Sequence, residues 1–161
     1  MSSWIKQFFT GADGIRRALN LYGPYVGAGV RVVEIDPEYR SVTVAMKLSW
    51  YNTNYVGTHF GGSLYSMIDP FFMLLLMNRL GRDYIVWDKA ATIDFIKPGR
   101  GLVTATMTLD DERLAEVLKA TADGQKYLPV WPVEIRDEDG ELVARVDKTL
   151  YIRRKRPEAI A

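Results

Sequence analysis

The stretch from Gly61 to Leu80 constrains the fold more than any other part of the sequence, because it predicts a helix that is apolar on nearly every side. Its apolar residues are Leu64, Tyr65, Met67, Ile68, Phe71, Phe72, Met73, Leu74, Leu75, Leu76 and Met77. A helix on a protein surface shows a single apolar stripe, so this helix has to be buried by neighbours on several sides. Its longest apolar run, Phe71 to Met77, is far shorter than the roughly 20 residues that span a bilayer.

Strand patterns fill most of the remaining chain. Alternating polarity and turn residues predict strands over 30–35, 41–48, 84–96, 102–109, 127–136 and 142–152. The face that the last of these strands buries carries Leu142, Ala144, Val146, Leu150 and Ile152. Pro129 and Pro132 confine the first half of the 127–136 strand to a sheet edge or a bulge, because proline has no N–H for the ladder. Tight turns join the later strands, so the sheet is expected to be largely antiparallel.

Shorter helices are predicted outside this pattern. Trp4, Ile5, Phe8 and Phe9 have helical spacing, as do the residues after Asp13, which is the expected N-cap of a second helix ended by Gly23-Pro24. Residues 110–122 predict a capped helix. A curved antiparallel sheet wrapped around the central helix satisfies the burial that both need. We therefore expect one α+β domain over 1–161, with an N-terminal helical segment at 1–27 and the core at 28–153.

The composition narrows the function classes. Lys plus Arg is 21 and Asp plus Glu is 20, so a net charge of +1 gives no overall attraction to nucleic acid or to an anionic membrane. The chain has no cysteine, which excludes disulfides, thiolate nucleophiles and cysteine metal sites. Its single histidine excludes a multi-histidine metal site within one chain. The N-terminus lacks an uninterrupted apolar stretch with a cleavage signal, so we expect a cytoplasmic protein without membrane insertion.

The segment from Asn54 to Asp69 is the candidate site. Glycines at a helix start allow a ligand to approach the backbone closely, and the free N–H groups there favour developing negative charge. The start at Gly61-Gly62 could therefore serve as an oxyanion hole for a thioester carbonyl. Asp69 follows seven residues after Gly62, and a carboxylate in an apolar helix needs partners or a task. The alternative is structural, because an Asp before Pro70 is a typical N-cap and first-turn pair.

The order of elements and this segment resemble the hotdog-fold thioesterase superfamily, in particular its PaaI-like branch and the DUF4442-type subgroup. That branch carries an Asn-x-x-Gly-x-x-His-Gly-Gly stretch and an acidic residue seven positions after the second glycine. This sequence matches it at Asn54, Gly57, Gly61, Gly62 and Asp69. The stretch 91–98 is also similar to the family strand that ends in a proline turn, and the likeness covers roughly residues 28–153. The family histidine position is Phe60, and the only histidine is one place earlier, at His59.

The resemblance implies a homodimer, or a tetramer, in which two sheets join side by side and an acyl-CoA or acyl-carrier thioester binds at the seam. The Gly62 N–H, with His59, would hold the thioester oxygen, and Asn54 would orient the water or the carbonyl. Asp69 of the partner chain would act as general base or as nucleophile. The substrate would also contact Gly61, Phe60, Ser63 and Tyr65. No metal or other cofactor is implied, and no nucleic acid partner.

Structural readings of the neighbouring residues compete with these roles. Asn52 and Asn54 could form turns, since asparagine tolerates the left-handed region, and we favour a functional role for Asn54 alone. The aromatic residues of the loop could line an acyl channel, but each taken singly favours the core; they are Trp50, Tyr51, Tyr55 and Phe60. The basic residues at 153–156 could meet CoA phosphates, although a solvated tail is the commoner role.

Three functions fit the sequence. The first is hydrolysis of an acyl-CoA thioester, and the second is acyl or lipid binding without catalysis, which the displaced His59 and the Asp69-Pro70 pair favour. The third is dehydration or hydration of an acyl thioester by a His and Asp pair. The first is the expected function, and the acyl length is left open.

Overall fold

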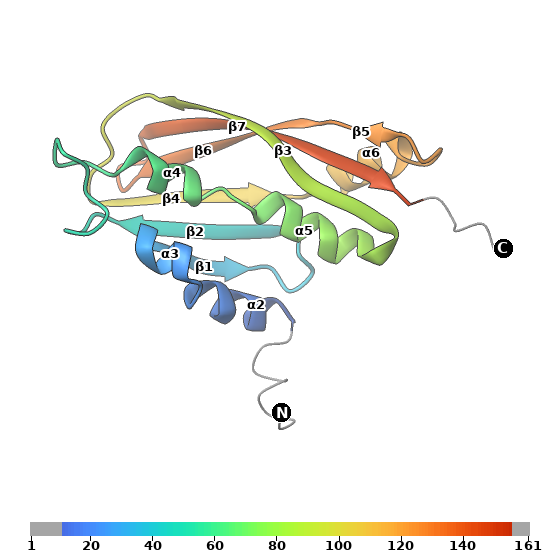
Figure 1. Cartoon of the computed structure of the whole chain (residues 1–161), viewed down its shortest axis with the longest axis horizontal. Coiled ribbons are helices and arrows are strands. Elements are labelled where there is room, and N and C mark those ends of the chain that lie inside the picture. The colour runs from blue at the N-terminus through green and yellow to red at the C-terminus, as the bar shows by residue number, and fades with distance from the viewer. Residues whose placement is uncertain (1–10, 156–161) are drawn as a thin grey trace, which may run out of the picture.

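The computed structural model describes residues 11–155, so the helix predicted around Trp4 to Phe9 lies outside the described residues. Its strands are β1 (Val30–Ile35), β2 (Ser41–Lys47), β3 (Tyr84–Phe95), β4 (Leu102–Thr108), β5 (Lys126–Tyr127), β6 (Val130–Asp137) and β7 (Leu142–Arg154). They form one antiparallel sheet in the order β1-β2-β4-β6-β7-β3, with β5 beside β7 (Figure 1). The antiparallel pairing and the other predicted strands are thus confirmed, but the strand predicted over 127–136 is two strands, β5 and β6, which are separated at Pro129.

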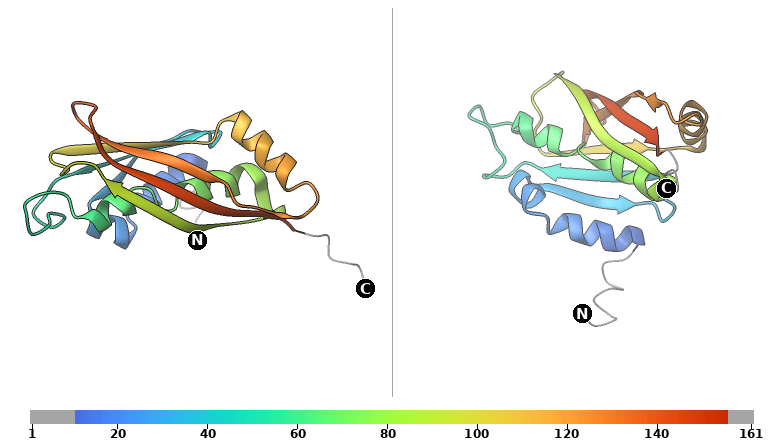
Figure 2. Two further views of the ribbon diagram at one scale, coloured as in Figure 1. Left: turned by 90° about the horizontal axis from the view of Figure 1, so that it is seen from above. Right: turned by 45° about the vertical axis from the view of Figure 1, so that its right-hand side comes forward.

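The helices are α2 (Gly11–Asn20), α3 (Gly23–Ala28), α4 (Gly61–Ser66), α5 (Phe71–Leu80) and α6 (Asp111–Ala120). Figure 2 shows α2 along the β1 side of the sheet and α6 on the side of β5, with α5 lying across the face of the sheet between them. Asp110 caps α6 by accepting a hydrogen bond of 2.7 Å from the Arg113 N–H, as predicted. The sheet therefore curls around α4 and α5, which is the predicted architecture.

Side chains that alternate along the strands build the core beneath α5. On β4 the buried positions are Val103, Ala105, Met107 and Leu109 just after it. They meet the buried face of α5, formed by Phe71, Phe72, Leu75 and Leu76. Phe72 packs edge-on against Trp131 of β6, with ring centroids 5.1 Å apart. Full burial of such side chains contributes about 1.5–3 kcal/mol each, which holds α5 against the sheet.

The central helix is broken, which corrects the prediction of one continuous helix over 61–80. Residues 67–70 form turns, and the Asp69-Pro70 bond is cis. Proline has no N–H for the helical ladder, and the residue before it avoids helical angles. The N-cap position of α5 is Pro70, without a side-chain cap bond, so Asp69 does not cap this helix. The far side of α5 is also less buried than expected, since Met77 is 50% exposed.

The N-terminal region also differs from the prediction. The helix α2 begins at Gly11, so Asp13 lies inside its first turn, where it pairs with Arg16 at 3.0 Å instead of capping. The Gly23-Pro24 pair opens α3, because a proline in the first turn of a helix loses no hydrogen bond. We had expected these two residues only to end the preceding helix.

The two edges of the sheet are treated differently. Asn20 of α2 covers the β1 edge: its amide donates to the Val32 carbonyl at 3.0 Å and accepts from the Val32 N–H at 2.8 Å. Strand β3 pairs with β7 along one side, and within the described residues no strand pairs with its other side. Phe95, on this strand, is 56% exposed. A long bare edge strand of this kind is a ready template for pairing with another chain.

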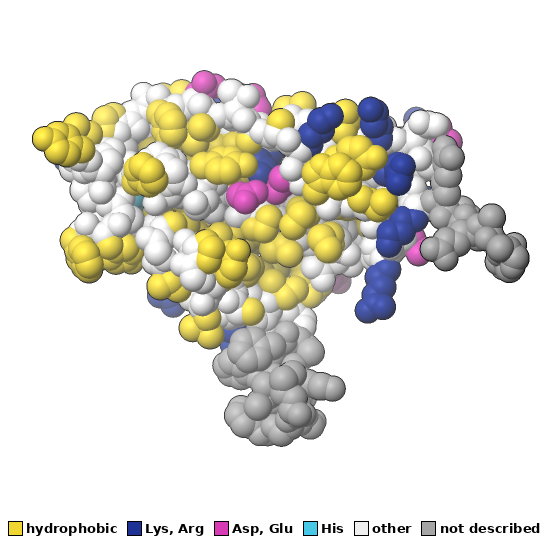
Figure 3. Space-filling view, viewed as in Figure 1, with side chains coloured by type: hydrophobic (Ala, Val, Ile, Leu, Met, Phe, Trp, Pro, Cys, Tyr) yellow, Lys and Arg dark blue, Asp and Glu magenta, His cyan; other side chains and the backbone are white. Residues whose placement is uncertain are grey.

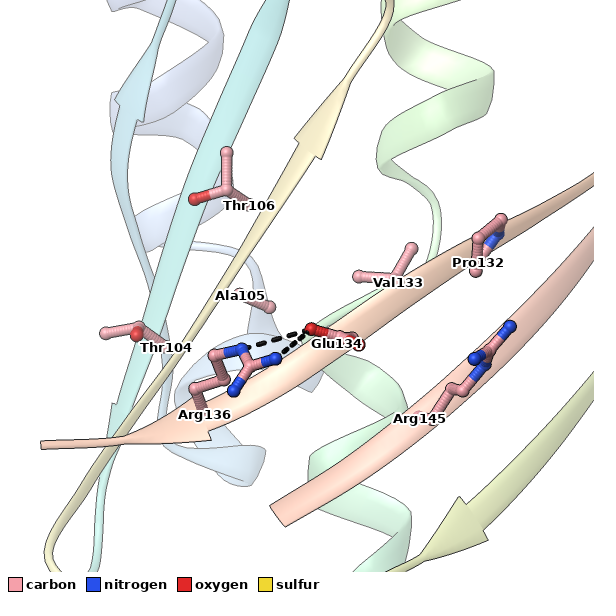
Figure 4. A pocket seen from close by; sticks show the side chains of 8 residues that line it. All are labelled: Thr104, Ala105, Thr106, Pro132, Val133, Glu134, Arg136 and Arg145. Carbon is pink, nitrogen blue, oxygen red and sulfur yellow. Dashed lines mark hydrogen bonds and ion pairs between the residues drawn. The ribbon is translucent and has the colours of Figure 1, made fainter. Parts of the chain in front are cut away.

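Strands β4 and β6 separate after a short pairing. Only Val103 to Ala105 pair with β6, so the first half of β6 pairs with β7 alone, as Pro132 predicted. A shallow groove between the two strands follows on the outer face (Figure 4). It is lined by Thr104, Ala105, Thr106, Pro132, Val133, Glu134, Arg136 and Arg145. The Glu134–Arg136 ion pair drawn there is half exposed, and surface pairs of this kind contribute little to stability.

Candidate active site

The loop before α4 is held by the side chains of its own asparagines. Asn54 donates to the Thr58 hydroxyl at 2.8 Å and to the His59 carbonyl at 3.2 Å, and it accepts from the Val56 and Thr58 N–H groups. All of these contacts lie within the loop. The structure therefore uses the Asn54 amide to shape the turn, and the water-orienting role stays a prediction.

Asn52 is buried and has the structural role that we expected. It accepts a hydrogen bond from the Ser49 N–H at 2.7 Å and donates to the Lys47 carbonyl at 3.0 Å. Its amide also reaches the Ala28 carbonyl at 3.4 Å, at the end of α3. Because Asn52 joins the end of β2 to α3, it fixes where the loop leaves the sheet.

His59 lies in the interior, with 3% of its surface exposed. Its Nε2 lies 3.1 Å from the Gly101 carbonyl, which makes Nε2 the donor, and its backbone N–H bonds the Gly99 carbonyl. Burial lowers the pKa of His59, against the opposing effect of the Gly101 bond. Its Nδ1 is buried and has no hydrogen-bond partner among the described residues. The imidazole thus joins the loop to the 99–101 turn, and a contact with substrate stays a prediction.

The start of α4 presents free backbone amides. Phe60, at the N-cap, has extended backbone angles and makes no side-chain cap bond. Within the described part of the chain, the N–H groups of Gly61 and Gly62 have no hydrogen-bond acceptor. A Cβ on Gly62 would come within 2.5 Å of the Phe60 ring, and one on Gly61 within 2.9 Å of the Phe95 ring. A side chain at either glycine would therefore have to displace the ring of Phe60 or Phe95, both of which are more than half exposed.

A cavity of about 440 Å³ lies beside these amides, between α3, the loop and α4. It is lined by Gly27, Ala28, Tyr51, Asn52, Thr53, Phe60, Gly62, Ser63 and Ser66. Three of the predicted substrate-binding or catalytic positions, Phe60, Gly62 and Ser63, therefore share one cavity wall. Concave sites of this size are typical of small-molecule binding.

The loop aromatics are exposed, which corrects the expectation that each favours the core. Trp50 is 91% exposed, Tyr55 is fully exposed, and Phe60 is 56% exposed. Trp50 packs edge-on against Tyr51, and neither residue belongs to the hydrophobic core of the described residues. The core is already filled by the strands and α5, so the polar backbone of this loop stays on the surface with its side chains.

Asp69 is part of an ion cluster at the junction of α4 and α5. Its Oδ1 lies 3.1 Å from Nζ of Lys148, a β7 residue with no exposed surface. The same Nζ lies 3.3 Å from Oδ2 of Asp88 on β3 and 3.2 Å from the Tyr65 hydroxyl on α4. Tyr25 of α3 donates to the Asp69 carbonyl at 2.5 Å. Segments far apart in the sequence therefore meet at one buried ammonium group.

The three charged side chains of the cluster differ in how far they are buried. The Asp69 side chain is 46% exposed, whereas that of Asp88 is 15% exposed and that of Lys148 is not exposed. In Figure 3 a small acidic group lies among hydrophobic side chains in the middle of the face that carries α4, α5 and β3. A fully buried lysine without partners would cost several kcal/mol, so its acidic neighbours are needed for it to be charged. Asp69 is the member of the cluster that reaches water.

The electrostatics follow from this arrangement. Burial, together with the neighbouring Asp69 carboxyl, raises the pKa of Asp88 to about 6, against the opposing charge of Lys148. Burial alone would lower the pKa of Lys148, but Asp88, the Tyr65 hydroxyl and Asp69 outweigh it and raise that pKa. Near neutral pH the cluster therefore holds the positive charge of Lys148 beside two carboxyl groups. The more buried of these, Asp88, loses its proton only near pH 6.

Lys148 and Asp88 are the residues that the sequence analysis missed. Lys148 stands in the same phase as the buried residues Val146, Leu150 and Ile152, so its side chain has to point inward. The signal in the sequence was a single lysine at an inward-pointing position of an alternating strand, and it could have identified Lys148. Asp88 gave a weaker signal, because β3 has a bulge between Asp88 and Ala90 that breaks its alternation.

The structure brings some predicted residues together and leaves others apart. Tyr65 and Asp69 meet at Lys148, while Gly62 faces the cavity at the other end of α4. Gly62 opens α4, whereas Asp69 lies in the turn after its end, and the cavity beside Gly62 is lined by neither Asp69 nor Lys148. Among residues 11–155, no group of His, Cys, Asp and Glu side chains could hold a metal ion, and no helix could span a membrane.

Comparison with solved structures shows the fold. A probable thioesterase of unknown function from Pseudomonas aeruginosa matches with a TM-score of 0.73 at 21% identity, over 87% of this chain and 94% of its own. A thioesterase from Haemophilus influenzae matches with a TM-score of 0.65 at 15% identity, over 90% and 92%. The E. coli PaaI protein of the phenylacetic acid degradation operon matches with a TM-score of 0.56 at 20% identity, over 83% of this chain and 84% of its own. The predicted hotdog fold is confirmed.

Sequence comparison gives the family. A search of curated proteins finds no match. The model of the family described as "Domain of unknown function (DUF4442)" matches residues 11–152, which is most of the chain. The chain is therefore a hotdog-fold protein and belongs to the DUF4442 family.

Proposed function

We propose that the protein is a thioesterase that hydrolyses acyl-CoA or a related acyl thioester. The observation that carries the proposal is the placement of Asp69: its carboxylate caps no helix and is held at the surface by a fully buried lysine. A carboxylate fixed in this way, half exposed amid hydrophobic side chains, is suited to proton transfer or nucleophilic attack. The similarity to the solved structures of a probable thioesterase and of a thioesterase supports the same reaction class.

The reaction needs an oxyanion site and a base. The Gly62 N–H, free of other acceptors, would donate to the thioester oxygen as negative charge develops there. As a general base, Asp69 would take a proton from water while the water oxygen attacks the carbonyl carbon. The C–S bond then breaks, and the thiolate takes the proton from Asp69, which leaves a carboxylic acid and a free thiol. As a nucleophile, the Asp69 carboxylate would instead attack the carbonyl carbon and expel the thiolate, which takes a proton from water, and so form a mixed anhydride. A water molecule would then hydrolyse the anhydride, which releases the carboxylic acid and restores Asp69.

A second copy of the chain completes the site in this proposal. Gly62 lies at the start of α4 and Asp69 in the turn after its end, so in this proposal each meets its counterpart from another protomer. The bare edge of β3 is suited to antiparallel pairing with the same strand of a partner, since α2 already covers the β1 edge. Antiparallel pairing places the end of one β3, near Gly61 and Phe95, opposite the start of the other. The homodimer is thus part of the proposed function.

The cavity beside α4 is the proposed substrate site. Phe60 and Tyr51 supply apolar walls for an acyl or pantetheine chain, and Ser63 and Gly62 supply polar groups near the reacting carbonyl. Tyr65 is farther along α4, where its hydroxyl accepts a hydrogen bond from Lys148. We assign Tyr65 to the Asp69 end of the site for this reason.

Acyl binding without turnover is the second candidate, and one observation favours it. Asn54 and His59 were both expected in catalysis. The side chain of Asn54 bonds groups of its own loop, and the side chain of His59 bonds the Gly101 carbonyl. A site without them has fewer groups to polarise the carbonyl. The assay below separates this candidate from hydrolysis.

The test is thiol release from a panel of acyl-CoAs of different chain length, with Asp69→Asn as the inactive variant. We expect a loss of at least about 100-fold in kcat/KM for Asp69→Asn, the usual effect of removing a general base. Asp139→Asn, in the exposed turn between β6 and β7, is the matched control and should keep wild-type activity. Equal background release by wild type and Asp69→Asn would refute hydrolysis. A co-purifying acyl chain without turnover would establish binding, and an absorbance change on enoyl-CoA would indicate hydration.

A further inference from the structure

The buried ammonium group of Lys148 is surrounded by oxygen atoms, which a lysine that only filled space would not need. Its ammonium group has three N–H donors, and three oxygens lie within 3.3 Å of it, on Tyr65, Asp69 and Asp88. These acceptors come from α4, from the turn after α4 and from β3. Because the side chain is fully buried, no water competes for the donors. The ammonium group therefore fixes the direction of each carboxyl group that it touches.

Asp88 is the buried counterpart of Asp69. It lies just before the bulge in β3, at 3.3 Å from Lys148, and neither of its oxygens has a well-aligned hydrogen-bond partner among the described residues. The ionisable groups around it are Lys148 of β7, Asp69 beyond α4, Tyr65 of α4 and Tyr25 of α3. Burial and the nearby Asp69 raise the pKa of Tyr25, so that tyrosine is neutral throughout the working range. The charge that varies near Asp69 is therefore that of Asp88.

We propose that Lys148 and Asp88 are positioning residues for the Asp69 carboxylate: Lys148 aims it, and the protonation of Asp88 controls how strongly Lys148 attracts it. This inference rests on the proposed role of Asp69 in thioester hydrolysis. When Asp88 is ionised, it shares the positive charge of Lys148 with Asp69. When Asp88 is protonated, the whole charge acts on Asp69, which becomes a weaker base. The activity should then fall on acidification through about pH 6, where Asp88 takes up its proton.

Kinetics of two variants test the proposal. Asp88→Asn mimics the protonated form of Asp88, so the acidic limb of kcat/KM near pH 6 should disappear, and the activity at pH 8 should fall to about the level that wild type shows below pH 6. Lys148→Met releases the carboxylate from its fixed direction, so kcat should fall by about 10- to 100-fold while KM changes less than about twofold. Asp139→Asn, in the turn between β6 and β7, and Lys126→Met are both exposed; they are the matched controls and should keep the wild-type profile. An acidic limb that persists near pH 6 in Asp88→Asn would overturn the proposal.

A measurement without substrate separates this inference from the proposed function. In protein with ¹³C-labelled aspartate carboxyls, one resonance should titrate near pH 6 and disappear in Asp88→Asn, and the Asp69 resonance should respond at the same pH. Independent titration of the two carboxyls would overturn the coupling. If wild type hydrolyses no thioester but this coupling is present, the proposed function fails while the Lys148 cluster stands as a coupled carboxyl pair.

Discussion

Replacement of Lys148 by methionine should destabilise the protein in a way that depends on pH. The substitution keeps an unbranched chain of similar length but removes the positive charge that lies 3.3 Å from Asp88. The pKa of Asp88 is about 6 in the native protein, against its ordinary value of 3.8, so it is ionised at pH 7 and above. Without Lys148, burial and the neighbouring Asp69 keep Asp88 protonated well beyond neutral pH.

The size of the effect follows from proton linkage. Because the folded pKa of Asp88 is raised, the native protein loses stability between pH 3.8 and 6, and the loss stops once Asp88 ionises. In Lys148→Met the loss continues at about 1.4 kcal/mol for each further pH unit. The difference in the free energy of unfolding should therefore be about 1.4 kcal/mol at pH 7 and about 3 kcal/mol at pH 8. Near pH 5 this contribution vanishes, since Asp88 is protonated in both proteins.

Urea unfolding followed by tryptophan fluorescence, at pH 5.5, 7 and 8 and one fixed protein concentration, measures this difference. The chain has four tryptophans, among them the buried Trp131, which packs on Phe72 of α5. Lys126→Met, on the exposed strand β5, controls for the loss of a lysine and should give a difference that does not vary with pH. A Lys148→Met difference that is the same at pH 5.5 and pH 8 would refute the assignment of the raised pKa to Asp88.

Three further predictions concern the scaffold. Phe72→Ala should lower the free energy of unfolding by about 3–5 kcal/mol, because it leaves a cavity against Trp131; urea unfolding measures this, and a loss below about 1 kcal/mol would contradict the packing. Asp110→Ala should cost about 1 kcal/mol by removing the cap bond to the Arg113 N–H, and helical circular dichroism on melting should show the change. Burial lowers the pKa of His59, so the unfolded chain binds more protons below pH 6.5; relative to His59→Phe, the wild type should lose stability as the pH falls through 6.5, and parallel curves would contradict this.

The sequence was sufficient for the sheet because strand burial is a local pattern. Residues such as Val103 and Met107 alternate with polar neighbours, and a period of two fixes which side chains point inward whatever the partner strand is. The cap at Asp110 is equally local, since donor and acceptor are three residues apart. The break at Pro70 was also readable, and it was missed because the apolar residues on both sides continued the helical pattern.

The candidate site could be predicted only in part, because its partners come from distant segments. The amides at Gly62 follow from a helix start, which is a local feature. The contact between Asp69 and Lys148 joins residues 79 positions apart, and it depends on how β7 is paired and on where the helix breaks. Asp88 enters the cluster because β3 pairs with β7 in a register that no local pattern specifies. Exposure of the loop aromatics likewise depends on what else fills the core.

The cluster around Lys148 holds the Asp69 carboxylate in a fixed direction, and we expect it to lower the free energy of unfolding relative to neutral groups of the same size. Breaking a buried ion pair leaves an uncompensated charge, but replacing both members with neutral groups of similar volume is often neutral or stabilising. The double variant Lys148→Met with Asp88→Asn should therefore be at least as stable as wild type at pH 8, although Lys148→Met alone is not. If hydrolysis is the function, the same variant should stay as slow as Lys148→Met, because Asp69 has lost the group that aims it. A double variant that is both less stable than wild type and fully active would show that the cluster only holds the fold together.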